Sequence, residues 1–239
     1  MITNTLHQLL LSQIQEESSK NKPDLRFNAQ RYLGTTQKFY GLKIGQLINM
    51  VRNFYNEHGE ISVNGFCDLL DSLSTTGKSF EERILRGKLL DRFSKQRQEI
   101  PLEKLDYWLG FTNGWAEIDV ICQGVFTAEE ILTDWNKWDK FLRKLNKDNN
   151  VHKRRASLVL LTMPVRHSPD RRLANLAFDN IVPLMHEKDV LITKAISWLL
   201  RHLIKNHRQN VEAFLDKYSA QLPAIAVRET KRKLLTGKK

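Results

Sequence analysis

Cysteines and long apolar runs are scarce in this sequence, and each shortage excludes a class of protein. The 239 residues include only two cysteines, Cys67 and Cys122, which form no CxxC motif and have no pair of histidines nearby. A disulfide framework or a structural zinc site is therefore not expected. The scarcity of cysteine instead predicts a protein of the reducing cytoplasm. No apolar run approaches the roughly 20 residues that cross a bilayer. The amphipathic N-terminus also has no basic start and no small-residue cleavage site of a signal peptide.

Several catalytic signatures are also missing. The sequence has no glycine-rich phosphate loop, no G-x-S-x-G and no H-E-x-x-H, and its histidines are scattered. Motifs of nucleotide hydrolases, serine hydrolases and zinc proteases are thus absent.

The charge is distributed unevenly along the chain. The first 150 residues contain 20 basic and 20 acidic side chains, whereas residues 151–239 contain 18 basic and 7 acidic ones. The net charge of +11 therefore lies entirely in the last third. A neutral body with a basic C-terminal part suggests a surface for a polyanion, most commonly nucleic acid. A solvated basic tail is the alternative.

Hydrophobic periodicity is helical nearly throughout the chain, and no alternating strand pattern appears. Capping boxes mark two helix starts, at Ser79–Glu82 and Thr127–Glu130. After a first helix around Leu6–Ile14, the pattern predicts helices at 43–57, 62–73, 79–94, 101–111, 115–124, 127–145, 151–163, 171–184, 188–206, 208–218 and 222–235.

So many short helices favour an all-α solenoid of stacked helix pairs over a bundle, because a bundle core rarely accommodates about a dozen helices. No strict repeat is visible, so the repeats must be degenerate. We expect a single domain over residues 1–239, with 236–239 disordered. A solenoid of this kind is curved, and its basic C-terminal helices would line part of a concave groove.

Trp115 and Asp119 are spaced i, i+4 in NGWAEIDVIC, so they share one face of a helix. Ile118, Val120 and Ile121 can serve as core on its other faces. A carboxylate beside an aromatic ring suits recognition of a cation or of a developing positive charge. In the alternative interpretation Trp115 packs in the core and Asp119 is a solvated charge.

Two further clusters combine cations with apolar residues. His152, Lys153, Arg154 and Arg155 open an otherwise apolar helix, where cations oppose the helix dipole unless an anion lies nearby. Arg155, closest to the apolar stretch, must be paired or face a groove, and guanidinium fits phosphate bidentately. A basic first turn in solvent is the alternative.

The second cluster surrounds Trp198. Lys194 lies four residues before it and Arg201 three residues after it, so one helix face mixes aromatic and cationic groups, as at nucleic-acid contacts. A core tryptophan is the alternative. Near the N-terminus, Arg31-Tyr32 followed by Phe39-Tyr40-Gly41 predicts a helix end and turn with exposed aromatics.

Taken in order, these four segments resemble the DNA alkylation repair (AlkD-like) family of HEAT-like repeat DNA glycosylases. The resemblance runs from about Arg31 to Lys233. It consists of R-Y before an aromatic-Gly turn, W-x-x-x-D, R-A-x-L and K-A-I-x-W-x-L-R. It implies a monomeric, monofunctional enzyme that removes positively charged N3- and N7-alkylated purines from double-stranded DNA without metal or cofactor. The implied location is the bacterial cytosol, at the nucleoid.

The resemblance also implies roles for individual residues. Asp119 would stabilise the oxocarbenium-like sugar and position water, and Trp115 and Trp198 would flank the damaged nucleotide. The expected DNA-binding residues are Arg155, Arg154, Tyr32, Lys43, Lys194 and Arg201. The chain departs from the family pattern at Ala116 and Glu117, at Lys43 and at His152.

Two other functions are compatible with the same features. A non-catalytic HEAT-repeat protein that binds distorted or branched DNA would share the basic groove and make Asp119 dispensable. A protein-interaction solenoid with an acidic partner would show no preference for damaged DNA.

Overall fold

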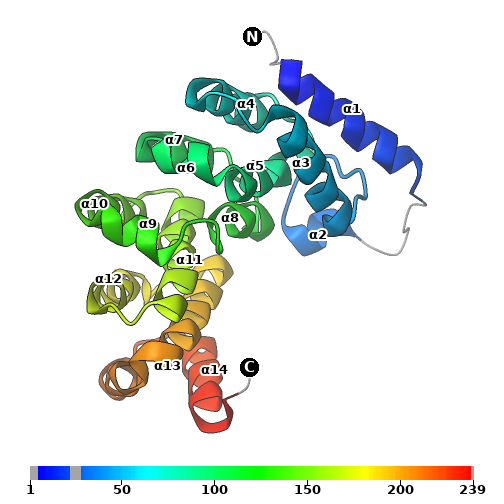
Figure 1. The fold of residues 1–239 in the computed structure, drawn as a ribbon. Coiled ribbons are helices and arrows are strands. Elements are labelled where there is room, and N and C mark those ends of the chain that lie inside the picture. Colours follow the sequence, from blue (N-terminus) through cyan, green and yellow to red (C-terminus); the bar gives the residue numbers. More distant parts are fainter. Residues whose placement is uncertain (1–4, 22–27, 238–239) are drawn as a thin grey trace. The chain divides into compact units, whose positions relative to one another are not determined.

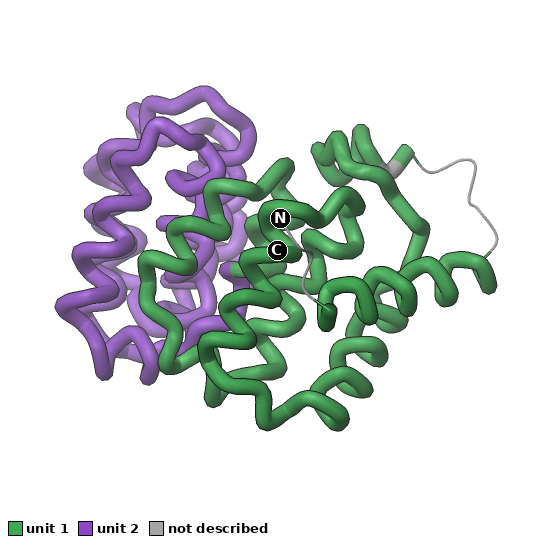
Figure 2. Tube along the Cα trace, turned by 90° about the horizontal axis from the view of Figure 1, so that it is seen from above, with its two compact units in different colours: residues 1–121 green, residues 122–239 purple. Residues whose placement is uncertain are grey.

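The structure is a computed structural model that describes residues 5–21 and 28–237 (Figure 1). The described residues form α-helices and one short 3-10 helix, and within these ranges no β-strand occurs beyond an isolated bridge between Lys38 and Ser79. The prediction of an all-α, solenoid-like fold is confirmed. The chain divides into two compact units, residues 1–121 and 122–239 (Figure 2), while the expectation of one functional domain stays a prediction.

The described residues of the first unit form eight helices. They are α1 (Thr5–Ser19), α2 (Ala29–Leu33), α3 (Ile44–His58), α4 (Val63–Thr75), α5 (Phe80–Arg92), α6 (Ser94–Glu99), α7 (Leu102–Leu109) and α8 (Trp115–Cys122). Helix α5 packs against α1, α3, α4 and α6 and is buried along almost its whole length. Phe93 lies at the centre of an aromatic cluster, stacked on Phe66 at 4.9 Å and tilted against Phe54 at 6.0 Å.

The second unit contains α9 (Ala128–Thr133), α10 (Trp135–Asn146), α11 (Val151–His167), α12 (Arg171–Ile181), the 3-10 helix η1 (Val182–Leu184), α13 (Val190–Tyr218) and α14 (Ala224–Thr236). Helix α11 is its centre and packs against α9, α10, α12 and α13. Its apolar stretch Leu158–Leu161 is fully buried, which accounts for a run that is hydrophobic on all sides. Each helix here packs mainly on helices one or two places away in sequence, as in a solenoid.

Helix boundaries follow the predicted ones where caps are present. Both capping boxes form, at Ser79 and at Thr127. The expected helix 127–145 is wrong in one respect, because Asp134, with φ −108° and ψ 40°, divides it into α9 and α10. Helix α6 was not expected at all. Helix α14 continues to Thr236 and ends at Gly237, so the expected disorder of 236–239 is wrong for these two residues, and residues 238–239 lie outside the described ones.

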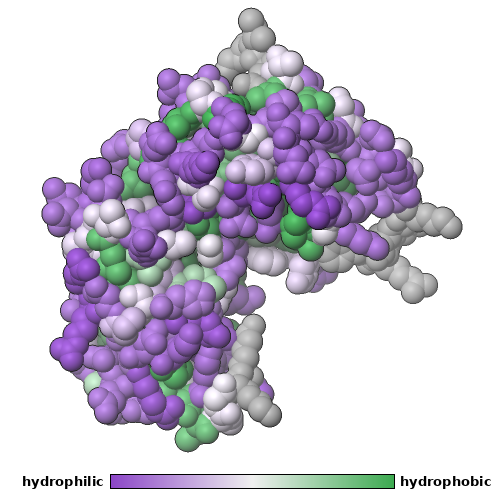
Figure 3. Space-filling model, in the orientation of Figure 1, coloured by the Kyte–Doolittle hydropathy of each residue, from purple (hydrophilic) through white to green (hydrophobic). Residues whose placement is uncertain are grey.

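On the face shown in Figure 3, the surface of each unit is mostly hydrophilic, with hydrophobic residues exposed in scattered places. The large apolar side chains that are most exposed are Leu235, Tyr32, Val190, Ile44, Ile48, Tyr107 and Phe111. Among the described residues, no helix has the length and apolarity that a bilayer crossing requires.

Candidate functional site

Helix α8, which carries Trp115 and Asp119, starts after a position that requires glycine. Gly114 has φ +83°, and a Cβ on it would lie 2.4 Å from the carbonyl oxygen of Gly34 and 2.5 Å from that of Leu33. Only glycine combines this backbone conformation with so close an approach. The end of α2 therefore packs directly against the start of α8, although some 80 residues separate them in sequence.

The side chain of Trp115 is fixed by the same contact. Its indole Nε1 donates a hydrogen bond to the main-chain carbonyl of Tyr32 at 2.9 Å. The two rings meet edge to face, with centroids 5.8 Å apart and planes at 83°. Tyr32 itself is 62% exposed. The structure thus brings together two of the predicted site residues and uses the only donor of the indole.

Asp119 lies on the accessible side of a largely buried helix. Ile118 and Ile121 are fully buried, as predicted, whereas Trp115, Val120 and Asp119 are half-buried. Because Trp115 and Asp119 are one turn apart, their side chains lie on the same side of α8.

A buried ion pair that the sequence pattern did not predict holds the inner face of α8. Glu117 accepts a hydrogen bond from Arg86 Nη2 on α5 at 3.0 Å and another from the backbone N–H of Asn113 at 3.1 Å. Arg86 also donates to the carbonyl oxygens of Arg83 and Trp108. Glu117 is 0% and Arg86 1% exposed. Glu117, where the chain departs from the family pattern, therefore holds helix α8 against α5.

Burial dominates the titration of both partners. It raises the pKa of Glu117, although Arg86 opposes the shift, and it lowers the pKa of Arg86 to about 10. At neutral pH the guanidinium remains charged and requires its carboxylate. Beside this pair α5 and α8 touch through backbone, since a Cβ on Gly87 would lie 2.1 Å from the carbonyl oxygen of Val120. The adjacent Arg86 and Gly87 are the sequence signal of this crossing.

In the second unit, protein anions resolve the conflict expected at the basic start of α11. Arg154 makes a two-point ion pair with Glu187, at 2.8 and 3.0 Å, and its Nη1 donates to the carbonyl oxygens of Asp148 and Asn149. Lys153 lies 3.6 Å from the carboxylate of Asp148. Four of the five N–H donors of Arg154, an expected DNA contact, are therefore already used within its own unit.

Arg155 points into the second unit rather than outward along its surface. Its side chain is 4% exposed, and Nη1 donates to the carbonyl oxygen of Leu191 at 2.5 Å, near the start of α13. Of the two expected alternatives, that Arg155 is paired or faces a groove, this backbone acceptor supplies the pairing. The role of Arg155 toward phosphate stays a prediction.

Trp198 on α13 is half-buried and, like Trp115, donates its indole N–H within the protein. The acceptor is Nε2 of His202 at 2.8 Å, and the two rings are nearly perpendicular, at 88°. Nδ1 of His202 lies 2.9 Å from the carbonyl oxygen of Thr162 on α11. The i, i+4 spacing of Trp198 and His202 is the sequence signal of this contact.

The remaining expected DNA contacts are of two kinds. Arg201 is 8% exposed, donates to the carbonyl oxygen of Ser197 and pairs with Glu229 at 3.2 Å. Lys43, which precedes α3, and Lys194 on α13 have exposed side chains.

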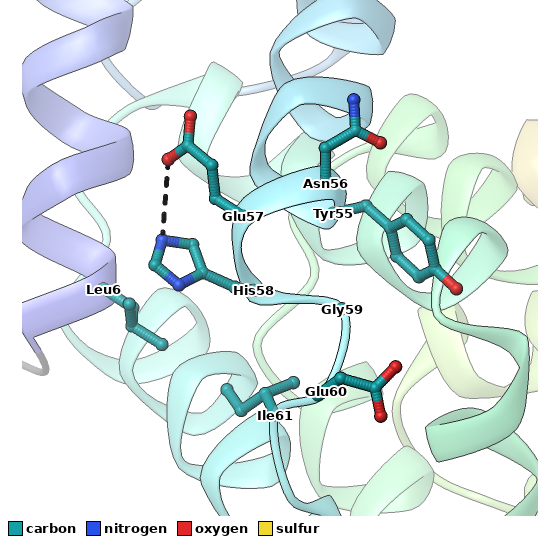
Figure 4. Close-up of a pocket in the computed structure, with 8 residues that line it drawn as sticks. All are labelled: Leu6, Tyr55, Asn56, Glu57, His58, Gly59, Glu60 and Ile61. Carbon is teal, nitrogen blue, oxygen red and sulfur yellow. Dashed lines mark ion pairs between the residues drawn. The ribbon is translucent and has the colours of Figure 1, made fainter.

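A surface depression of about 600 Å³ lies elsewhere in the first unit (Figure 4). It is lined by Leu6 and by residues 55–61 around the end of α3, and its ion pair between Glu57 and His58 is 3.9 Å long. None of the predicted site residues lines it. Among the residues that the structure describes, no group of three or more His, Cys, Asp or Glu side chains is arranged to hold a metal ion.

Comparisons with known proteins place the chain in a family. One solved structure, described as "Predicted DNA alkylation repair enzyme from Enterococcus faecalis", superposes with a TM-score of 0.71 over 92% of this chain and 96% of its own. At 17% identity this likeness shows the fold alone. No curated protein matches the chain. A family model described as DNA alkylation repair enzyme matches residues 14–234, and the chain therefore belongs to the family of DNA alkylation repair enzymes.

Proposed function

We propose that this chain is a monofunctional DNA glycosylase that excises positively charged N3- and N7-alkylated purines from double-stranded DNA. In this proposal it acts as a monomer in the cytosol, without metal or cofactor, and begins base excision repair. Membership of the DNA alkylation repair family supports the general role. The position of Asp119 on a helix that is held in place at its start and along its inner face is the observation that supports the specific reaction.

The fixed position of Asp119 suits electrostatic catalysis. Asp119 is half-buried on a helix whose start is fixed by Gly114 and whose inner face is fixed by Glu117 and Arg86. A carboxylate held in place before the reaction stabilises a developing positive charge without reorganising during it.

The chemistry needs little more than such a carboxylate. Alkylation makes the purine cationic, so the bond between C1′ and the base nitrogen breaks with its electron pair moving to the base, which leaves neutral. Positive charge then develops on the sugar, where Asp119 stabilises it and orients a water. The water attacks C1′ and loses a proton, which yields an abasic sugar.

Aromatic rings and cations supply binding in this proposal. Trp115 and Trp198 offer ring faces to the damaged nucleotide, and each cation–π contact contributes roughly 0.5–2 kcal/mol, depending on desolvation. Arg155 binds a backbone phosphate in this proposal. Because its side chain is buried against the carbonyl oxygen of Leu191, that contact requires the guanidinium to turn toward the surface.

The test is release of 7-methylguanine from methylated duplex DNA by the wild type, by Asp119→Asn and by Asp91→Asn. Asp119→Asn should retain DNA binding and lose at least about 100-fold in single-turnover rate, in line with the loss of one preorganised electrostatic group. Asp91→Asn removes the same charge from an exposed position on α5 and should leave the rate unchanged.

Two outcomes would contradict the proposal. An unchanged rate for Asp119→Asn would remove its catalytic role. Tight binding of branched or distorted DNA by a wild type that releases no base would favour the non-catalytic alternative.

A further inference from the structure

Trp198 is held by a chain of two hydrogen bonds that joins three points of the second unit. Its indole donates to His202 Nε2, one turn further along α13, and His202 Nδ1 lies within hydrogen-bond distance of the Thr162 carbonyl on α11. The imidazole therefore ties the orientation of the indole to the central helix of the unit.

The partners determine the protonation state of His202. An indole N–H can only donate, so Nε2 must accept; a carbonyl can only accept, so Nδ1 must carry the proton. Only the neutral imidazole with hydrogen on Nδ1 satisfies both. A protonated His202 would direct a second N–H at the indole donor and break the chain.

The surroundings stabilise that neutral form. Burial lowers the pKa of His202 to about 4, and the positive charges of Arg166 on α11, Lys233 on α14 and Arg201 on α13 act in the same direction, while the bond to Thr162 opposes them. At neutral pH the ring beside Trp198 therefore carries no charge.

We propose that His202 is a positioning residue for Trp198: it fixes the plane of the indole, occupies its only donor and, as a neutral ring, adds no positive charge of its own beside the indole. This inference rests on the proposed function and extends it to substrate selection. A ring so held attracts a cationic base through its face and offers no hydrogen bond to a neutral one. A charged imidazole at the same place would repel the cationic base.

The bond can be observed directly in the full-length protein labelled with nitrogen-15. The five tryptophans give up to five indole N–H signals, and Trp198→Phe identifies the one from Trp198. This signal should be protected from solvent exchange and should shift as the pH falls toward about 4, where His202 titrates.

Two variants separate hydrogen bonding from packing. His202→Phe keeps an aromatic ring but has no acceptor, so the Trp198 indole should exchange about tenfold faster. His202→Gln retains one acceptor and one donor and should restore part of the protection. His186→Phe alters an exposed histidine and serves as the control.

The same variants are then assayed for 7-methylguanine release. His202→Phe should lower the single-turnover rate more than it weakens binding of undamaged duplex, and His202→Gln should recover part of the rate. Unchanged indole exchange in His202→Phe overturns the positioning role, provided that the other four indole signals show an intact fold. If the Trp198 indole loses its protection from exchange in His202→Phe while the excision rate stays normal, the proposed effect of His202 on substrate selection is wrong. If the wild type releases no base while the indole responds as expected, the proposed function fails and the coupling of His202 to Trp198 stands.

Discussion

Arg86 and Glu117 show what a single residue contributes to holding the candidate site. Both are buried, each supplies the opposite charge that the other requires, and Glu117 lies two residues from Asp119 on the same helix. Pairs of this kind add little net stability compared with apolar residues, but removing one partner is costly because the other charge remains buried.

We expect Glu117→Gln to lower the free energy of unfolding by about 3–5 kcal/mol, because it leaves the Arg86 charge without a counter-charge. Urea unfolding at neutral pH measures the change. The double variant Arg86→Met, Glu117→Leu removes both charges and should be far closer to the wild type. A single variant as stable as the double one would mean that Arg86 is not charged in the folded state.

Single-residue features were predictable only where spacing alone determines them. The shared face of Trp115 and Asp119 follows from i, i+4 geometry, and the buried state of Ile118 and Ile121 follows from the same pattern. The pairing of Arg154 with Glu187 does not, since 33 residues separate the two and tertiary packing brings them together. The sequence therefore predicts that a basic side chain lies at the start of a helix. It does not predict whether that side chain is available to a ligand.

At the scale of helices, glycines at crossings control how closely elements approach. Gly114 and Gly87 each place backbone against backbone, at the start of α8 and at its contact with α5. The sequence predicted most helices, because caps and apolar periodicity are local. It did not predict the division at Asp134, which interrupts a continuous apolar pattern, or helix α6, whose residues Ser94–Glu99 are all polar or charged. The break between 206 and 208 was predicted, and His207 indeed has non-helical angles within α13.

Gly114→Ala should destabilise the protein by about 1–3 kcal/mol or more, because it combines an unfavourable φ with a clash against two carbonyl oxygens. It should also lower base release, since the start of α8 can no longer lie against α2. The control is Gly45→Ala, in helix α3, where a Cβ meets nothing within 4 Å and a gain of about 0.5–1 kcal/mol is expected. Equal stability of the two variants in urea would show that the close approach at Gly114 is not required.

At the scale of the whole chain, the division into units coincides with a division of charge. Residues 1–121 contain 15 basic and 15 acidic side chains, whereas residues 122–239 contain 23 and 12, so the second unit carries the entire +11. Internal ion pairs at Arg154 and Arg201 use part of that charge. Exposed cations of the second unit, such as Lys194, are further candidates for phosphate contacts.

DNA affinity should fall steeply with salt, and Lys194→Gln should reduce the slope of log K against log salt concentration by about 0.9, the value for one phosphate contact. Lys95→Gln removes an exposed charge from the neutral first unit and should leave the slope unchanged. Titrations of undamaged duplex at several salt concentrations measure both slopes. Affinity that is independent of salt would contradict DNA as the partner.

The internal hydrogen bonds of Trp115 and Trp198 have a consequence for the kind of information such a protein can read. A nucleobase is normally identified by its pattern of donors and acceptors, and an indole whose N–H already ends on a protein acceptor cannot take part in that comparison. What remains is electron density at the ring face, which responds to the charge of a base and not to which of its nitrogens carries the alkyl group. On the proposed function, chemically different lesions would then count as one substrate because they share a single positive charge.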